Sequence, residues 1–354
     1  MCWGITHYAL IYSAVTLYYG LVCSTNTMTA MSCPDNMMTH LKRQLYSMQV
    51  VLLALAVSAC AHVEAPARLG PNAPATSPYQ AATLKLLTLN MAHGRRDSFN
   101  QAMLSGSAIL ENLDELASVL RRVDADVVAL QEADGPSAWS GRFDHVDYLA
   151  NAAGYTWDAH SRHVRGKRIT YGTALLSRIA FQEVISHDFP ESPPTLRKGF
   201  TLGRVLWQPD ADKAPVNVDI LSVHLDFSRK SVREQQIRDI LAVLESREYP
   251  VIILGDFNSN WLSSDSVVRR LAECGSTRVY EPQAINLGTY NEGRHRLDWV
   301  LLSGDLDFKR YQVLPDVLSD HRAVYVEIDY IGNDGAVGID ADSKPAHCYD
   351  TNEP

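Results

Sequence analysis

The sequence predicts an α/β fold, a four-layer αββα sandwich in which two packed β-sheets are flanked by helices on both outer faces. Short apolar runs rich in β-branched residues, such as Val251–Leu254, are typical of buried strands. Ser107–Val123 and Arg229–Arg247 carry apolar residues three or four positions apart, which predicts amphipathic helices. Each predicted helix leads into an apolar run, and this strand–helix–strand order, together with hairpin-like pieces, fits a two-sheet sandwich.

Beside the run at residues 251–258, five strand-like runs begin or end at polar side chains. Each run is largely apolar and presents an amide, a carboxylate or an imidazole near one end. Polar groups gathered at one end of a sheet pack poorly, because each needs a hydrogen-bond partner or a metal. A site for a charged substrate requires such groups. In chain order the runs are Leu84–Asn90, Asp126–Glu132, Val216–His224, Leu297–Ser303 and Leu318–Val326.

The most informative run is Val251–Asn258, which ends in Gly-Asp-Phe-Asn. If the extended geometry persists, Asp256 and Asn258 leave the strand on the same side. One of them can then accept a proton or orient a water, while the other donates hydrogen bonds to an anion. Taken alone, the segment is explained equally well by a strand followed by an Asp/Asn turn.

The N-terminal region carries a targeting signal. A basic pair at 42–43 precedes the short apolar run Val50–Val57, and small residues come before Cys60. This order is typical of a secretory signal. It also resembles the bacterial lipoprotein box, so we interpret residues 38–59 as a signal peptide and Cys60 as the lipid anchor to a membrane. The predicted location is the bacterial cell envelope, with Ala61 favouring the outer membrane by analogy, and plain secretion is the alternative.

The remaining boundaries follow from composition. Residues 1–37 are an apolar leader or, as we prefer, a stretch upstream of the true start codon. Residues 60–81 are rich in Pro, Ala, Gly and Ser, which predicts a tether. The folded domain is expected at residues 82–330, and the Gly/Asp/Asn-rich segment 331–354 is predicted to be a disordered tail.

Composition and cysteine content limit the class of protein. A chain of 354 residues with 46% hydrophobic and 21% charged residues accommodates one large globular domain with appendages. The net charge of −9 disfavours unspecific binding to nucleic acid. Cys274 and Cys348 are the only cysteines after Cys60, and they fit no zinc motif. A disulfide between them is allowed in an oxidising compartment, but the sequence does not require one.

Seven short motifs follow one another within Leu84–Asp329: Leu-Asn-Met-Ala-His-Gly, Leu-Gln-Glu, Tyr-Gly-Thr-Ala-Leu-Leu-Ser-Arg, Val-His-Leu, Gly-Asp-Phe-Asn, Leu-Asp-Trp-Val and Ser-Asp-His-Arg. Each motif is weak alone, but the ordered series resembles the endonuclease/exonuclease/phosphatase superfamily. That group includes deoxyribonuclease I, apurinic endonucleases, neutral sphingomyelinases and inositol-polyphosphate phosphatases. The resemblance implies a deoxyribonuclease I-like sandwich and hydrolysis of a phosphoester.

The resemblance also implies a metal set and a catalytic set. The first would hold Mg²⁺, which takes oxygen ligands and few carboxylates, with Mn²⁺ as the alternative; its residues are Asn90, Glu132 and Asp320. In the second, a carboxylate orients an imidazole that handles the proton of, or the charge around, the attacking water. The carboxylate and imidazole of this pair are Asp298 and His321. Asp256 would orient the water, and Asn258 would donate to a phosphate oxygen. His224 would act as a donor or an acid on the far side of the phosphate.

Each of these residues also has a purely structural interpretation. Glu132 can be a solvated loop residue, and Asn90 can simply form the turn at a strand end. A lone Asp-His pair is usually a hydrogen-bonded loop element, which is the alternative for Asp298 and His321. A histidine in an apolar strand, such as His224, is more often a satisfied core residue.

Weaker candidates complete the survey. His93 either touches substrate or shapes its loop. The basic cluster at 162–168 (Arg162, Arg165, Lys167 and Arg168) can bind phosphate or anionic lipid, but a solvated charged loop is our preferred interpretation. Tyr171 resembles a substrate-side tyrosine of apurinic endonucleases only loosely. Lys198, Gly199 and Arg204 occur where some relatives approach the metal site, and the sequence assigns them no role.

We therefore predict a Mg²⁺-dependent hydrolase, a phosphodiesterase or a phosphatase, that cleaves its ester by metal-assisted in-line attack of water. Gly-x-Ser-x-Gly and Walker-type phosphate loops do not occur in the sequence. The substrate is left open among a small molecule, a lipid headgroup and nucleic acid, and a monomer is expected. One alternative is an extracytoplasmic nuclease. Another, of a different class, is a non-catalytic lipoprotein that binds lipid or nucleotide in an inherited pocket.

Overall fold

The computed structural model describes residues 77–98, 104–332 and 348. The predicted leader at 1–37, the signal peptide at 38–59, the anchor on Cys60 and most of the predicted tether lie outside these residues. Within the described part of the chain, no helix is both long enough and apolar enough to cross a membrane.

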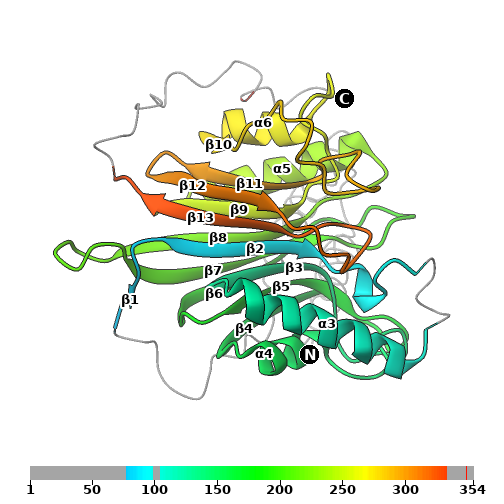
Figure 1. The fold of residues 1–354 in the computed structure, drawn as a ribbon. Coiled ribbons are helices and arrows are strands. Elements are labelled where there is room, and N and C mark those ends of the chain that lie inside the picture. Colours follow the sequence, from blue (N-terminus) through cyan, green and yellow to red (C-terminus); the bar gives the residue numbers. More distant parts are fainter. Residues whose placement is uncertain (1–76, 99–103, 333–347, 349–354) are drawn as a thin grey trace, which may run out of the picture. The chain divides into compact units, whose positions relative to one another are not determined.

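Two mixed β-sheets form the centre of the domain, and helices cover their outer faces (Figure 1). One sheet has seven strands: β1 (Tyr79–Gln80), β7 (Gly199–Gln208), β8 (Val216–His224), β9 (Val251–Asp256), β11 (Asp298–Ser303) and β10 (Thr277–Val279) in spatial order, with β6 (Phe181–Asp188) on β7. The other has six: β12 (Leu306–Val313), β13 (Val324–Tyr330), β2 (Leu84–Asn90), β3 (Val127–Asp134), β5 (Tyr171–Ser177) and β4 (Trp157–Val164).

The helices pack on opposite sides of this pair of sheets, as Figure 1 shows. α3 (Gly106–Val123) and α4 (His145–Ala153) cover the six-stranded sheet, and η1 (Ala92–Gly94) follows β2. α5 (Lys230–Leu244) and α6 (Val267–Cys274) cover the seven-stranded sheet. One apolar core fills the space between the sheets, and a further core lies under each helical layer. The predicted four-layer sandwich is therefore confirmed.

Most predicted elements occur close to their expected bounds. The strands at 84–90 and 216–224 match residue for residue, and the two predicted helices become α3 and α5. The serine hydroxyl of Ser105 accepts a hydrogen bond from the amide of Ala108, which caps the start of α3. The short helices α4 and α6 escaped the sequence analysis, because eight or nine residues give only two turns of apolar periodicity.

Two boundaries differ from the sequence prediction. Tyr79 and Gln80 lie in the predicted tether at 60–81, yet they form β1 beside β7, and the hydroxyl of Tyr79 donates to Asp126 at 2.5 Å. Cys348 lies in the predicted tail, yet its sulfur is bonded to Cys274 at the end of α6. The folded domain therefore begins a few residues earlier than residue 82, and Cys348 is covalently joined to it.

Strand register brings the polar strand ends together. β8 and β9 are parallel with His224 opposite Asp256, while β11 is antiparallel to β9 with Asp298 opposite Asp256. The start of β7 joins them, because Gly199 pairs with His224. In the other sheet the start of β13 lies beside the end of β2. One edge of the sandwich, called the site edge below, thus carries polar groups from both sheets.

Candidate active site

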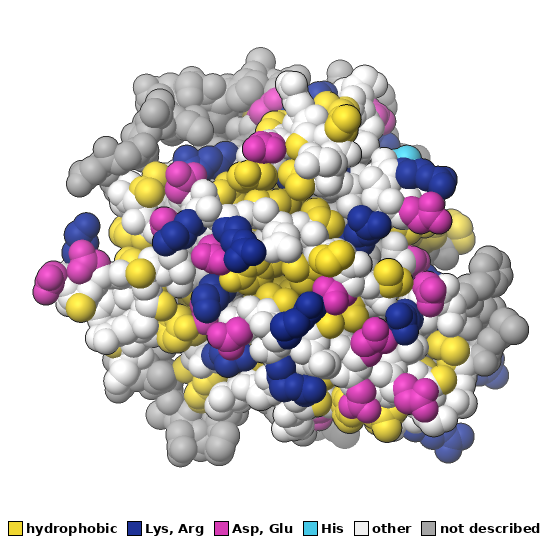
Figure 2. Space-filling view, viewed as in Figure 1, with side chains coloured by type: hydrophobic (Ala, Val, Ile, Leu, Met, Phe, Trp, Pro, Cys, Tyr) yellow, Lys and Arg dark blue, Asp and Glu magenta, His cyan; other side chains and the backbone are white. Residues whose placement is uncertain are grey.

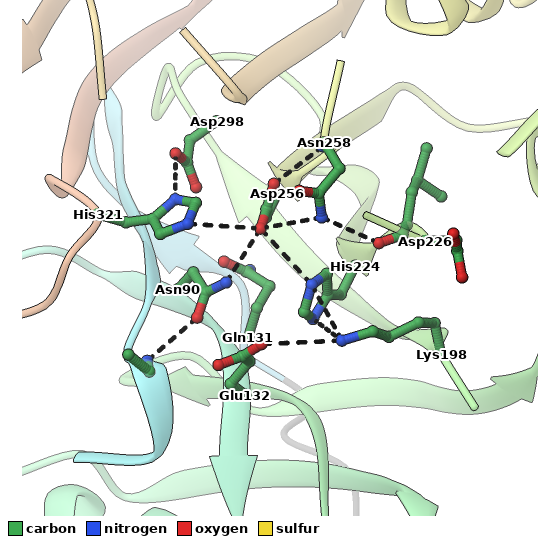
Figure 3. A network of polar contacts seen from close by, with 12 residues as sticks. Asn90, Gln131, Glu132, Lys198, His224, Asp226, Asp256, Asn258, Asp298 and His321 are labelled. Atoms are coloured by element: carbon green, nitrogen blue, oxygen red, sulfur yellow. Dashed lines mark hydrogen bonds and ion pairs between the residues drawn. The ribbon is translucent and has the colours of Figure 1, made fainter. Parts of the chain in front are cut away.

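The carboxylate of Asp256 is the centre of a buried polar network (Figure 3). Its Oδ2 accepts a hydrogen bond from Nδ2 of Asn90 at 3.0 Å. The same oxygen lies 3.5 Å from Nε2 of His224 and 3.8 Å from Nε2 of His321. Burial raises the pKa of Asp256 to about 6, although the neighbouring His321 opposes this shift. The carboxylate is thus held between two imidazoles.

The Gly-Asp-Phe-Asn backbone explains how Asp256 reaches this position. Gly255 has a φ of +145°, and a Cβ on it would lie 2.0 Å from the carbonyl oxygen of Val223 on β8. Glycine therefore allows β9 to approach β8 closely just before the carboxylate. Asn258 has a φ of +47°, so the chain turns out of the strand there. The backbone amide of Asn258 donates to Oδ1 of Asp256 at 2.9 Å.

The side chains of Asn258 and Asn90 are both engaged within the protein. Nδ2 of Asn258 donates to the carbonyl oxygen of Leu225 at 3.0 Å and to Oδ2 of Asp256 at 3.3 Å. The predicted donation from Asn258 to a phosphate oxygen therefore requires one of these bonds to open. Oδ1 of Asn90 accepts from the amide of Ala92 at 3.1 Å, which leaves one lone pair of that oxygen for another partner.

His321 and Asp298 form the expected pair. Nδ1 of His321 lies 2.8 Å from Oδ2 of Asp298, and both side chains are buried. Burial pushes the pKa of His321 down, but the charges of Asp298 and Asp256 outweigh this and raise it to about 10. The imidazole therefore carries its positive charge while its Nε2 faces Asp256.

Glu132 reaches the same site through a β-bulge. The register between β3 and β5 shifts between Gln131 and Ala133, and Glu132 itself has a φ of +50°. Such a bulge re-aims one side chain out of the regular alternation. The carboxylate then lies 3.4 Å from Nε2 of His93 and 3.8 Å from Nζ of Lys198. Burial would raise the pKa of Glu132, but these two positive neighbours prevail and lower it to about 2.

Lys198, to which the sequence assigns no role, also lies in this polar network. Its side chain is buried, and Nζ lies 3.2 Å and 3.3 Å from the two ring nitrogens of His224, opposite Glu132 (Figure 3). Burial lowers the pKa of Lys198, while Glu132 and Asp256 counteract that shift. Burial together with the nearby Lys198 holds the pKa of His224 well below its usual range. No local pattern marks Lys198, because only the pairing of β7 with β8 brings it here.

His93 lies on the outer side of Glu132. Its Nδ1 is 2.7 Å from Oδ1 of the buried Asp134, and its ring meets Tyr171 edge-on with centroids 4.9 Å apart. A second edge-on contact, at 5.7 Å, is made with Trp139. His93 and Tyr171 therefore belong to the wall beside Glu132.

The remaining candidates lie further from Asp256. Asp320 forms an ion pair with Arg95 and accepts a hydrogen bond from Ser319 at 3.1 Å. In the basic cluster at 162–168, Arg162 pairs with Asp144 at 2.7 Å, and the other three side chains are exposed. Arg204 belongs to a different region, where it binds Asp219 and Glu183.

Two positions at the site offer carboxylate oxygens of the kind that a hard divalent cation takes as ligands. Among the described residues, the one group of at least three His, Cys, Asp or Glu atoms within 4.8 Å of one another is Asp256, Asp298 and His321. In that group Asp298 already holds His321, and Asp256 accepts three hydrogen bonds from two asparagines. The oxygens of Glu132, in contrast, meet their cationic neighbours only at 3.4 Å and 3.8 Å. Glu132 is therefore the better oxygen ligand.

The comparison with protein families identifies one match. The sequence model of the endonuclease/exonuclease/phosphatase family matches residues 87–321, about two thirds of the chain. This range includes every candidate residue described above. No curated protein sequence matches the chain significantly.

Solved structures with the same fold come from several bacteria. A family protein from Leptotrichia buccalis has a TM-score of 0.52 and 16% identity, over 70% of this chain and 100% of its own. A mannosyl-6-phosphatase from Bacteroides thetaiotaomicron has 0.54 and 17%, over 70% and 100%. A family protein from Bacteroides vulgatus has 0.55 and 13%, over 70% and 99%. Likenesses at this identity establish the shared sandwich.

Proposed function

Because the chain belongs to the endonuclease/exonuclease/phosphatase family, a family of phosphoester hydrolases, we propose that it is a Mg²⁺-dependent hydrolase that cleaves its ester by in-line attack of water. One observation carries this proposal: Asp256 lies between two imidazoles, with the buried Asp298–His321 pair on one side and Lys198 on the other. So many ionisable groups in one place do not stabilise a folding core. They suit the hydrolysis of a phosphoester, which requires neutralisation of the phosphate charge and an oriented water.

The residues divide the work by their chemistry. Because burial raises the pKa of Asp256 to about 6, its carboxylate is suited to orient a water and accept its proton. His321, fixed by Asp298, presents a positively charged Nε2 beside Asp256, where it stabilises negative charge on the phosphoryl oxygens. Lys198 supplies a second positive charge at His224 and Glu132. His224, which its burial and the nearby Lys198 keep neutral, can donate to the ester on the side of β8.

The metal proposal rests on Glu132. With Asn90 and Asp320 as the predicted partners, Glu132 would hold the Mg²⁺ ion, and Mn²⁺ is the alternative. A bound divalent cation supplies Lewis-acid neutralisation of phosphate charge. The pKa of Glu132, lowered to about 2, supports a carboxylate that is always available as an oxygen ligand.

The substrate proposal stays at the level of a phosphomonoester or phosphodiester. One structural neighbour is a mannosyl-6-phosphatase, which supports phosphomonoesters as a class to test. A nuclease is supported less, because the chain has a net charge of −9. On the face shown in Figure 2, Lys and Arg are interspersed with Asp and Glu rather than joined in a basic stripe.

We also propose that the protein is a monomer in the bacterial envelope, held by a lipid on Cys60 or else secreted. The bond between Cys274 and Cys348 supports an oxidising compartment, since disulfides form and persist there.

Metal removal tests the proposed function directly. The protein should hydrolyse bis-p-nitrophenyl phosphate or p-nitrophenyl phosphate, lose that activity in EDTA, and regain it when Mg²⁺ or Mn²⁺ is added in excess. His321→Ala should remain inactive under all these conditions. Hydrolysis that survives EDTA contradicts the metal proposal. Tight binding of nucleotide or lipid without hydrolysis of any ester favours the non-catalytic binding protein. Sphingomyelin and plasmid DNA, added to the same panel, test the lipid and nuclease alternatives.

A further inference from the structure

Large apolar side chains are exposed mainly at the site edge. Among the described residues, eight large hydrophobic side chains are exposed, and five of them lie on loops that adjoin candidate site residues. Most soluble proteins scatter such side chains singly over the surface. The five, with their exposed fractions, are Leu196 (47%), Phe227 (65%), Leu262 (59%), Ile285 (88%) and Val317 (49%).

Strand register shows that these five loops share one edge. Phe227 follows β8 three residues after His224, and Leu262 follows the end of β9. Leu196 precedes β7, whose first residue pairs with His224. Ile285 lies in the loop before β11, which starts opposite Asp256, and Val317 in the loop that carries His321. The other three exposed side chains lie elsewhere: Leu110 on α3, Tyr249 before β9, and Ile331 after β13.

One turn of the same edge is strongly basic, although the net charge of the whole chain is −9. This β4–β5 turn exposes Arg165, Lys167 and Arg168. Arg165 and Leu196 line one open cavity of about 440 Å³, so basic and apolar side chains stand next to each other.

We propose that the site edge docks onto an anionic phospholipid surface. Separate apolar side chains on five loops suit a fluid bilayer, which admits each of them, better than a protein partner, which needs a continuous complementary surface. The three exposed basic side chains of the β4–β5 turn match anionic headgroups. Docking itself does not depend on the proposed function. Its consequence does, namely that the site meets phosphoesters presented at a lipid surface.

A tryptophan placed in the rim tests docking without relying on activity. Phe227→Trp in the full chain is mixed with vesicles of dibrominated phosphatidylglycerol, which quench tryptophans that enter the bilayer. Its fluorescence should show quenching beyond that of the parent chain, weaker at high salt and weaker still with dibrominated phosphatidylcholine. The matched control is Tyr249→Trp, an exposed aromatic position away from the site edge, which should show no added quenching.

A polar substitution in the rim gives the second readout. Phe227→Ser/Leu262→Ser should partition at least tenfold less into phosphatidylglycerol vesicles, while Leu110→Ser/Tyr249→Ser should partition like the parent. Hydrolysis of bis-p-nitrophenyl phosphate should be equal in both double variants, so a failure of the proposed function is recognised separately. The proposal is overturned if neither tryptophan is quenched, as would follow if the N-terminal segment alone binds the vesicles. Equal quenching of both tryptophans, or a rim-dependent dimer in sedimentation without vesicle binding, overturns it as well.

Discussion

The two opposite edges of the β-sandwich both hold carboxylates, and these are compensated to different degrees. Near the start of β8, Asp219 is fully buried and receives two hydrogen bonds from Arg204 and two from Arg247, at 2.8–3.3 Å. Both guanidinium groups also reach Glu183, so two negative and two positive charges balance. At the site edge, Glu132 and Asp256 meet their cationic neighbours, His93, Lys198 and His321, only at 3.4–3.8 Å. Full compensation marks the scaffold, and partial compensation leaves room for a substrate and a cation.

Removing the charge of Glu132 is the strongest test of this comparison. Glu132→Gln keeps the shape but removes the proposed oxygen ligand, so kcat/KM for bis-p-nitrophenyl phosphate should fall by roughly 10³. The melting temperature should fall modestly, because the pKa of Glu132, lowered to about 2, means that its charge is favourable in the folded protein. Glu183→Gln at the opposite end is the matched control and should retain activity. A fully active Glu132→Gln would contradict the assignment of Glu132 to the metal.

The reverse outcome is expected for Asp219→Asn. Two half-buried guanidinium groups lose their shared, fully buried counter-charge, so the free energy of unfolding should fall by about 3 kcal/mol. The protein that remains folded should hydrolyse the ester at the parent rate. Urea denaturation and kinetics on the same preparation measure both quantities. If Asp219→Asn instead lowers kcat and leaves the free energy of unfolding unchanged, Asp219 is coupled to the active site and is not part of a separate scaffold.

Lys198 provides a smaller, sharper test at the site edge. Lys198→Met preserves much of the buried chain length but removes the positive charge between Glu132 and His224, so kcat should fall roughly a hundredfold. Stability should not decrease, since burial already disfavours this ammonium. Lys213→Met, at an exposed position, should change neither quantity. If Lys198→Met lowers stability and leaves kcat intact, Lys198 is part of the scaffold.

His160, on β4, is buried in its neutral form, in contrast to the buried charges described above. Its Nε2 is hydrogen-bonded to the carbonyl oxygen of Ala133 at 3.1 Å, and burial lowers its pKa to about 4. The unfolded chain takes up a proton near pH 6.5, before the folded protein does. The stability that the neutral imidazole contributes is therefore present above pH 6.5 and lost as the pH falls toward 4, by about 3 kcal/mol.

His160→Gln keeps a side-chain donor but cannot titrate, so its unfolding free energy should depend less on pH between 6.5 and 4. His295→Gln, at an exposed histidine, should retain the parent slope. Denaturation curves at several pH values measure the difference. Equal slopes for all three proteins would mean that His160 is not the linked group.

Local sequence pattern was sufficient for most of the fold and for much of the site. The apolar strand runs, the two longer amphipathic helices and the polar residues at strand ends are properties of neighbouring residues, so they could be read directly. His224, Asp256, Asp298 and His321 were each found at the end or start of such a run, and register does bring them together.

The sequence by itself thus determined the αββα sandwich, the family and the polar strand ends, because periodicity and short motifs depend on local residue order. Only the tertiary structure decided which charges meet. The bulge that aims Glu132, the pairing that brings Lys198 to His224, and the bonds that occupy Asn258 depend on strand register between distant segments. The sequence also does not distinguish Asp219, whose charge is fully compensated, from Asp256, whose charge is compensated only in part. The free energy of a buried charge is set by the groups that surround it in space.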